Sequence, residues 1–298
     1  MTTNTELLAS CWTSAGKTGP SIGNEMSPVP LRERIEAAGR TGWSGFGLFH
    51  KDLIEARQTI GLSTLGAILR DNGMKHVELE FLTDWWADGA ARADSDRIRT
   101  HMFECAGELG VQTIKVGADL SPNPRPFDQY TEHFALLAHD AERHGVRAAL
   151  EFMPMANPRT VREAADIVRN AGERAGGLCI DIWHINRAGT SYEEMVAAVD
   201  PDMVFVVELN DAASTPDGTL WDDTVNSRKY CGEGDFDVPK FVAAILSTGY
   251  RGHWGVEIIS TRHRNTPVED GLRLAHDTAI RSVANAYDLI RIADPAHP

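Results

Sequence analysis

The sequence predicts a single (β/α)8 TIM barrel domain over residues 1–298. Eight short, nearly continuous apolar runs alternate with longer helical patterns along the whole chain. Strands that are buried on both faces of a parallel sheet have this composition. A doubly wound open sheet is the structural alternative, but the glycine-rich phosphate loop that usually follows an early strand in such sheets is absent.

Each expected strand is a short run of aliphatic and aromatic residues. The runs lie at about 7–12, 45–50, 76–82, 113–118, 147–153, 178–183, 203–209 and 254–259. Helical patterns fill the intervals between them, and several end at a glycine, which is the usual residue after a helix. These glycines are Gly42, Gly110, Gly145, Gly172 and Gly249.

Two segments stand outside this alternation. Residues 212–236 follow the seventh strand and are rich in Gly, Asp, Ser and Thr, which predicts a long βα loop over the barrel mouth. The tail "DPAHP" is expected to fray.

One helical pattern, "PRTVREAADIVRNAG", is expected to begin with Pro158 near its first turn.

Bulk properties exclude several classes of protein. The formal net charge of -14 disfavours a nucleic-acid-binding role, because an acidic surface repels phosphates. The 4 cysteines are far apart and form no CxxC pair, so a disulfide framework or a cysteine zinc site is not expected. The first residues lack the pattern of a secretory signal, and no apolar stretch reaches the roughly 18 residues of a membrane span. The expected location is cytoplasmic.

Four consecutive strands each end with a carboxylate among apolar neighbours. These are Glu151 in "AALEFMP", Asp181 in "CIDIWH", Glu208 in "FVVELND" and Glu257 in "WGVEIIS". The C-terminal ends of barrel strands meet at one face, where active sites lie. Four carboxylates converging there would repel one another unless a cation were present. Such a hard oxygen donor set suits Mg²⁺, Mn²⁺ or Ca²⁺ more than zinc.

The motifs "LEFMP", "CIDIWH", "RKYCGEGDFD" and "GVEIIS" resemble those of the xylose isomerase-like TIM barrels, most strongly over residues 147–260. This superfamily includes sugar isomerases and epimerases, inosose dehydratase, dehydroshikimate dehydratase and the metal subunit of C-glycoside deglycosidases. The resemblance implies one divalent ion, Mn²⁺ in the first place and Mg²⁺ as the alternative, held by Glu151, Asp181, Glu208 and Glu257. Glu208 departs from the pattern, since the family usually has histidine there.

The chemistry implied by the resemblance is proton abstraction beside a carbonyl, with a metal-stabilised enediolate. Glu151 and Glu257 correspond to the acid and base of the epimerases, and His184 and Arg228 to residues that contact substrate. The expected substrate is a sugar, keto-sugar or inositol-type polyol, without a phosphate. If a leaving group departs after proton abstraction, the same site is a lyase.

Other polar and aromatic residues at strand ends are further candidates for substrate binding. His50 follows the second strand, Glu80 lies in the third and Lys115 in the fourth, so all three could line the mouth. Lys115 could equally pair with a strand carboxylate. Trp12 could form an apolar wall for a sugar ring, or serve packing alone.

The carboxylates have structural alternatives too. Glu151 and Glu257 could pair with arginines such as Arg147 or Arg251, and Asp181 could cap a loop. Glu208 could belong to a buried ion pair. The neighbouring residues at 210 and 211, an asparagine and an aspartate, are expected to hydrogen-bond the loop that follows them.

Three other functions are known or conceivable for barrels with polar strand ends. An endonuclease IV-type repair enzyme would need a histidine-rich zinc cluster, which the strand ends lack. An enolase-type barrel would need a capping domain, for which 298 residues leave little room. A non-catalytic barrel that binds a ligand or a partner after its metal site has degenerated is favoured by Glu208. A homo-oligomer or a complex with a small partner subunit is compatible with any of these.

Overall fold

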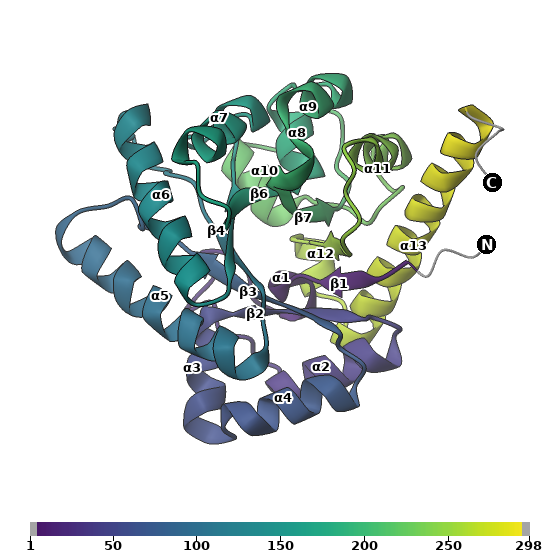
Figure 1. The fold of residues 1–298 in the computed structure, drawn as a ribbon. Coiled ribbons are helices and arrows are strands. Elements are labelled where there is room, and N and C mark those ends of the chain that lie inside the picture. Colours follow the sequence, from purple (N-terminus) through teal and green to yellow (C-terminus); the bar gives the residue numbers. More distant parts are fainter. Residues whose placement is uncertain (1–4, 294–298) are drawn as a thin grey trace.

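The computed structural model describes residues 5–293. Eight parallel strands form a closed barrel in chain order, with β8 pairing with β1, and Figure 1 shows the helices arranged around it. The predicted TIM barrel is therefore confirmed. The strands are β1 (Leu7–Ala9), β2 (Gly45–Phe49), β3 (His76–Leu82), β4 (Thr113–Val116), β5 (Arg147–Glu151), β6 (Gly176–Asp181), β7 (Val204–Leu209) and β8 (Trp254–Val256).

Helices follow every strand. Those before β5 are α1 (Cys11–Ser14), α2 (Leu31–Arg40), α3 (His50–Thr59), α4 (Leu62–Asp71), α5 (Gly89–Leu109) and α6 (Phe127–Arg143). Those after β5 are α7 (Val161–Ala171), α8 (Ile182–Arg187), α9 (Tyr192–Ala198), the 3₁₀ turn η1 (Pro201–Met203), α10 (Leu220–Asn226), α11 (Val238–Ser247), α12 (Thr261–Arg264) and α13 (Val268–Ala293).

The ends of the helices follow the expected punctuation. Gly110 and Gly172 adopt left-handed conformations directly after α5 and α7, at φ values of 71° and 69°. The predicted start of the helix near Pro158 is wrong. Thr160 caps α7 instead: its side chain accepts the amide of Glu163, whose carboxylate bonds back to the amide of Thr160, so the helix begins at Val161.

The segment between β7 and α11 has structure of its own. Within residues 212–236 lies α10, which Thr219 caps, and Asp211 forms an isolated antiparallel bridge with Lys229. The Asp211 carboxylate accepts the amide hydrogens of Ala212, Gly232, Gly234 and Phe236. Its expected role in holding the following loop is confirmed. The tail "DPAHP" lies outside the described residues.

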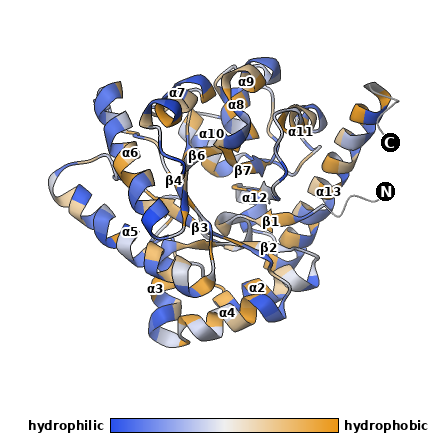
Figure 2. Cartoon of the chain, viewed as in Figure 1, coloured by the Kyte–Doolittle hydropathy of each residue, from blue (hydrophilic) through white to orange (hydrophobic). Residues whose placement is uncertain are grey.

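Apolar packing holds the layer of helices against the barrel. One large cluster joins the strands to the helices, and Figure 2 shows hydrophobic residues on the central strands β1 and β2, whereas α5 and α6 carry both kinds. A smaller cluster consists of Ala149, Cys179 and Val206 from β5, β6 and β7. The Cys179 thiol lies 3.7 Å from a carboxylate oxygen of Glu208, so this small cluster is an apolar support beneath the strand-end carboxylates.

Two expectations from composition can be compared with the structure. Within residues 5–293 the 4 cysteines are buried and free, so the expectation that no disulfide framework forms is confirmed. In the same residues, no helix combines the length and the apolar character needed to cross a membrane.

Gly47 in β2 provides a test of packing inside the barrel. A Cβ at this position would meet a carboxylate oxygen of Glu80 and, at 2.7 Å, the amide nitrogen of Cys11, which donates to that same carboxylate. We expect Gly47→Ala to lower the free energy of unfolding by about 1–3 kcal/mol through overpacking, as measured by urea denaturation.

Gly107→Ala is the matched control for Gly47→Ala. Gly107 lies in α5, and a Cβ there would meet nothing within 4 Å. This variant should be more stable than the wild type by about 0.5–1 kcal/mol, because alanine loses less backbone entropy than glycine in a helix. Equal effects of the two substitutions would contradict the close packing around Gly47.

Candidate metal centre

The structure brings the four predicted carboxylates together at the C-terminal end of the barrel. Glu151, Asp181, Glu208 and Glu257, called here the carboxylate quartet, each offer one oxygen within 4.8 Å of the others. Asp181 and Glu208 are 0 % exposed, and Glu151 and Glu257 keep 4 % and 5 %. The two residues that resemble an acid–base pair are thus the two that retain contact with the outside.

Strand register explains this convergence. Glu151 and Asp181 are the last residues of β5 and β6, and Asp181 lies directly opposite Glu208 in the β6–β7 ladder. Glu257 follows the last residue of β8, and its amide donates to the Leu209 carbonyl at 3.0 Å. Four consecutive strands therefore end at one level and present their carboxylates to one point.

Asp181 has two roles in the structure. Its Oδ1 accepts the amide of Trp183 at 2.6 Å, so it caps α8, and its Oδ2 accepts Nη1 of Arg228 at 2.5 Å. Burial alone would raise the pKa of Asp181. The Arg228 guanidinium, helped by smaller contributions from neighbouring polar groups, outweighs burial, so the pKa is lowered. The expectation for Asn210 is wrong: its amide donates to Asp181 Oδ1 rather than to the loop.

Arg228 also joins Asp181 to Glu257. The same Nη1 donates to Glu257 Oε2 at 2.8 Å, so Glu257 pairs with Arg228 and not with Arg251, which donates to main-chain carbonyls. Burial, and next the negative charge of Glu208, raise the pKa of Glu257 well above its ordinary value. This carboxyl group is therefore poised to keep a proton when no further cation is present.

Glu151 has a different partner. Its Oε1 lies 3.0 Å from Nε2 of His184, while Arg147 contacts Thr113 and the ring of Phe205. Burial and the Glu208 charge raise the pKa of Glu151 well above its ordinary value. Burial lowers the pKa of His184 to about 4, which leaves its imidazole neutral at pH 7.

Glu208 accepts hydrogen bonds from residues on two other strands or their ends. Its Oε1 accepts the Ser10 hydroxyl and Nζ of Lys115, both at 2.5 Å. Lys115 also binds Oε2 of Glu80 at 2.7 Å, and Oε1 of Glu80 accepts the amide of Cys11. Burial raises the pKa of Glu208, and Lys115 partly opposes the shift. Glu208 is thus both a member of the quartet and half of a buried ion pair.

Ser10 and Cys11 were not singled out from the sequence. They follow β1, a strand of only 3 residues, and their polar contacts come from a hydroxyl and a main-chain amide. The rule that functional groups lie at strand ends selects Trp12 from the first strand, and it would also have found Ser10 had it been applied to the hydroxyl two residues earlier.

Two predicted site residues, Trp12 and His50, form no hydrogen bond or ion pair with the quartet within residues 5–293. Trp12 packs against Phe49 with ring centroids 4.8 Å apart and ring planes tilted by 48°, in an apolar cluster with Val225 and Ile259. His50 begins α3. Burial lowers the pKa of His50 to about 4.

The charges around the quartet fit a divalent cation. Five buried carboxyl groups, the quartet and Glu80, face two buried cations, Lys115 and Arg228, so the acidic groups outnumber the basic ones by three in the described part of the chain. The donors are all carboxylate oxygens, which suit hard ions such as Mg²⁺ and Mn²⁺. A divalent ion bound here would lower the repulsion that raises the pKa of Glu151 and Glu257.

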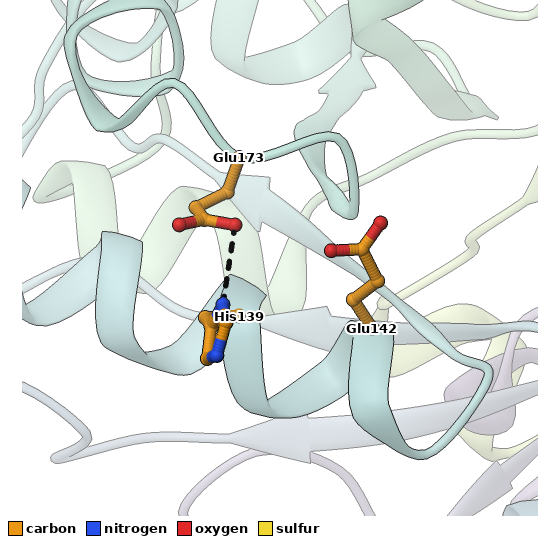
Figure 3. A group of neighbouring side chains, drawn as sticks. All are labelled: His139, Glu142 and Glu173. Carbon is orange, nitrogen blue, oxygen red and sulfur yellow. Dashed lines mark ion pairs between the residues drawn. The ribbon is translucent and has the colours of Figure 1, made fainter.

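A second group of possible ligands lies on the surface. Figure 3 shows His139 and Glu142 on α6 beside Glu173, with Nδ1 of His139 3.6 Å from Glu173 Oε2. His139 and Glu142 are exposed, and they occupy the last turns of α6, which lead into the start of β5. This group is therefore at the end of the barrel opposite the quartet.

The stability of the metal-free protein is expected to fall as the pH rises above 6.5. Between the ordinary carboxyl pKa of 4.5 and the raised values of Glu151 and Glu257, the folded state binds more protons than the unfolded state. Stability is then lost with rising pH through that window. His184, with its lowered pKa of about 4, gives the opposite slope, but only between about pH 4 and 6.5.

This slope is measured by urea denaturation in EDTA between pH 6.5 and 8. The double variant Glu151→Gln/Glu257→Gln serves as the comparison, because it lacks both raised carboxyl groups, and its profile should be flatter. A wild-type profile that rises over this range would contradict the assignment.

Comparisons with known proteins agree with the geometry. The model of the xylose isomerase-like TIM barrel family matches residues 35–278, which include the whole quartet. An inosose isomerase of Halalkalibacterium halodurans is 26% identical over 155 residues, which are 51% of this chain and 54% of that protein. A 3-dehydroshikimate dehydratase of Pseudomonas putida is 26% identical over 261 residues, covering 82% of this chain and 39% of that protein. The chain therefore spans about half or less of these curated relatives.

Solved structures show the same fold. The IolI protein with a bound zinc atom superposes with a TM-score of 0.80 at 19% identity, over 94% of this chain and 98% of that one. An L-ribulose 3-epimerase superposes with a TM-score of 0.75 at 14% identity, over 98% and 99% of the two chains. Because the family match extends over most of the sequence, the chain belongs to the xylose isomerase-like TIM barrel family.

Proposed function

We propose that this protein is a divalent-metal-dependent isomerase or epimerase of a sugar, keto-sugar or inositol-type polyol. The observation that carries the proposal is the convergence of the buried quartet at the catalytic face of the barrel. Glu151, Asp181, Glu208 and Glu257 would hold the ion, Mn²⁺ in the first place and Mg²⁺ as the alternative. The ion would supply positive charge where an enediolate develops.

Glu151 and Glu257 are the proposed base and acid. They come from β5 and from the end of β8, and both retain a little exposure. Burial and the charge of Glu208 raise the pKa values of both carboxyl groups, which helps each of them to hold a proton that it can pass to a substrate carbon. One would remove the proton beside the carbonyl and the other would return it, which gives the epimer when the two approach from opposite faces of the substrate.

The remaining residues are proposed to position the substrate. His184 is neutral and buried, and its Nδ1 has no partner among residues 5–293, so it can bind a substrate oxygen. Arg228 reaches the quartet from the segment after α10 and can bind a second oxygen. Trp12 and Phe49 offer an apolar wall for a sugar ring, and His50 stands beside Phe49 at the start of α3.

A lyase is the second candidate. The observation that favours it is that the 3-dehydroshikimate dehydratase relative matches 82% of this chain. Both activities begin with removal of a proton next to a carbonyl. They differ in whether a leaving group departs before the proton returns.

The test is proton exchange in D₂O, followed by NMR. The Mn²⁺-loaded protein is incubated with unphosphorylated ketoses, inososes and 3-dehydroshikimate. Deuterium at the carbon beside the carbonyl supports an isomerase or epimerase, and a new alkene or aromatic signal supports the lyase. If metal binds but no member of the panel reacts, the proposed activity on these substrates is contradicted, and co-purification of a second chain would indicate a catalytic subunit that needs a small partner.

A further inference from the structure

Lys115 is a charged side chain in the interior of the barrel. It lies in β4 and is 1 % exposed. Its Nζ is 2.7 Å from Glu80 and 2.5 Å from Glu208, and 4.0 Å from Glu257. A buried lysine is costly unless its charge is paired, and here it is shared by two carboxylates.

The segment after β1 also donates hydrogen bonds to both of these carboxylates, to the second oxygen of Glu80 and to the same oxygen of Glu208 that Lys115 binds. Glu80 Oε1 accepts the amide of Cys11, and Glu208 Oε1 accepts the hydroxyl of Ser10. Glu208 Oε1 therefore has two donors, whereas Oε2 has only the weak thiol contact of Cys179 at 3.7 Å. This arrangement leaves Oε2 as the oxygen that Glu208 can offer to the quartet.

We propose that Lys115 is a positioning residue, a built-in counter-cation that fixes Glu208 and keeps the quartet assembled before any metal ion enters. With its two short bonds given to protein carboxylates, Lys115 acts on Glu208 rather than on substrate. This inference deepens the proposed function, since it rests on Glu208 being a metal ligand. It also explains how the barrel tolerates a fourth carboxylate beside three others.

The test separates the charge of Lys115 from its bulk. Methionine has nearly the same length, so Lys115→Met keeps the packing and removes the charge. The variants are Lys115→Met, Glu208→Gln and the double variant, with Lys240→Met as the control, because Lys240 forms an exposed ion pair with Glu193. Melting temperatures are measured for each after dialysis against EDTA.

Lys115→Met is expected to lower the melting temperature by roughly 10 °C, because it leaves two buried carboxylates without their cation. In the Glu208→Gln background, the same substitution should lower it by about half as much, since one of those carboxylates is then neutral. Lys240→Met should shift it by about 1 °C or less. Recovery of a folded double variant where Lys115→Met alone fails to fold would also support the proposal.

Equal losses of melting temperature in the wild-type and Glu208→Gln backgrounds would overturn the proposal. Failure of both Lys115→Met and the double variant to fold would overturn it too. A second readout adds saturating Mn²⁺, which should raise the melting temperature of Lys115→Met by more than that of the wild type, because the ion replaces the missing charge. If the wild type binds no Mn²⁺, the metal of the proposed function fails, while the comparison in EDTA still decides the role of Lys115.

Discussion

Replacing Glu257 with glutamine is expected to lower the rate of deuterium exchange into a turned-over substrate by about 10²–10⁴-fold. Glutamine keeps the shape of the side chain and an oxygen for Arg228, but it cannot accept a proton. The site would still bind substrate through His184 and Arg228. We therefore expect the loss mainly in kcat, measured by NMR in D₂O at saturating Mn²⁺ with the substrate identified from the panel.

Glu151→Gln should cause a loss of similar size, since acid and base act in the same cycle. Glu55→Gln is the matched control, because Glu55 is an exposed residue on α3. Metal content is measured in every variant, so that loss of the ion is distinguished from loss of the base. A Glu257→Gln variant that retains both the ion and the wild-type exchange rate would show that Glu257 is not the base or acid.

Replacing Arg228 with methionine is expected to lower the free energy of unfolding by about 3–5 kcal/mol, because it leaves two buried carboxylates without their partner. Arg228 is 3 % exposed, and its Nη1 binds both Asp181 and Glu257. Its Nη2 donates to the hydroxyl of Thr224, and the guanidinium lies 5.6 Å from the centroid of Trp183. The measurement is urea denaturation in EDTA at pH 7.

The matched control for Arg228 is Arg40→Met. Arg40 pairs with Glu269 on the surface, where both side chains are more than a third exposed. The loss there should be about 0–1 kcal/mol, since solvent screens the pair. If Arg228→Met cost no more than Arg40→Met, then Arg228 would not be holding the quartet together.

The barrel and the quartet could be predicted from the sequence because both follow a one-dimensional rule. Apolar runs mark the strands, and a carboxylate that ends such a run must lie at the catalytic face of a parallel barrel. Glu151, Asp181, Glu208 and Glu257 were identified in this way. The helix that starts at Val161 was placed less well, because Pro158 is the more conspicuous signal and the Thr160 cap is local.

Contacts across the barrel could not be predicted with the same rule. Lys115 and Glu208 are 93 residues apart and come from β4 and β7, so their pairing depends on the tilt and register of the closed sheet. From the sequence, Lys115 could contact substrate or pair with a strand carboxylate, and Glu208 could bind a metal or belong to a buried ion pair. His50 is a strand-end residue like the quartet, yet it begins α3 and forms no hydrogen bond or ion pair with the quartet within residues 5–293, since register decides which residues face the centre.

The most direct test of the central claim is elemental analysis of protein purified without chelators or a histidine tag, and then incubated with Mn²⁺. The account predicts about one manganese ion per chain, displaced by excess Mg²⁺ and lost in Glu208→Ala, as expected for a site of hard oxygen ligands. Glu173→Ala, in the exposed surface group, should leave this stoichiometry unchanged. Absence of bound metal from the wild type, even in excess Mn²⁺, would contradict the account and leave the quartet as a charge cluster that only Lys115, Arg228 and bound protons neutralise.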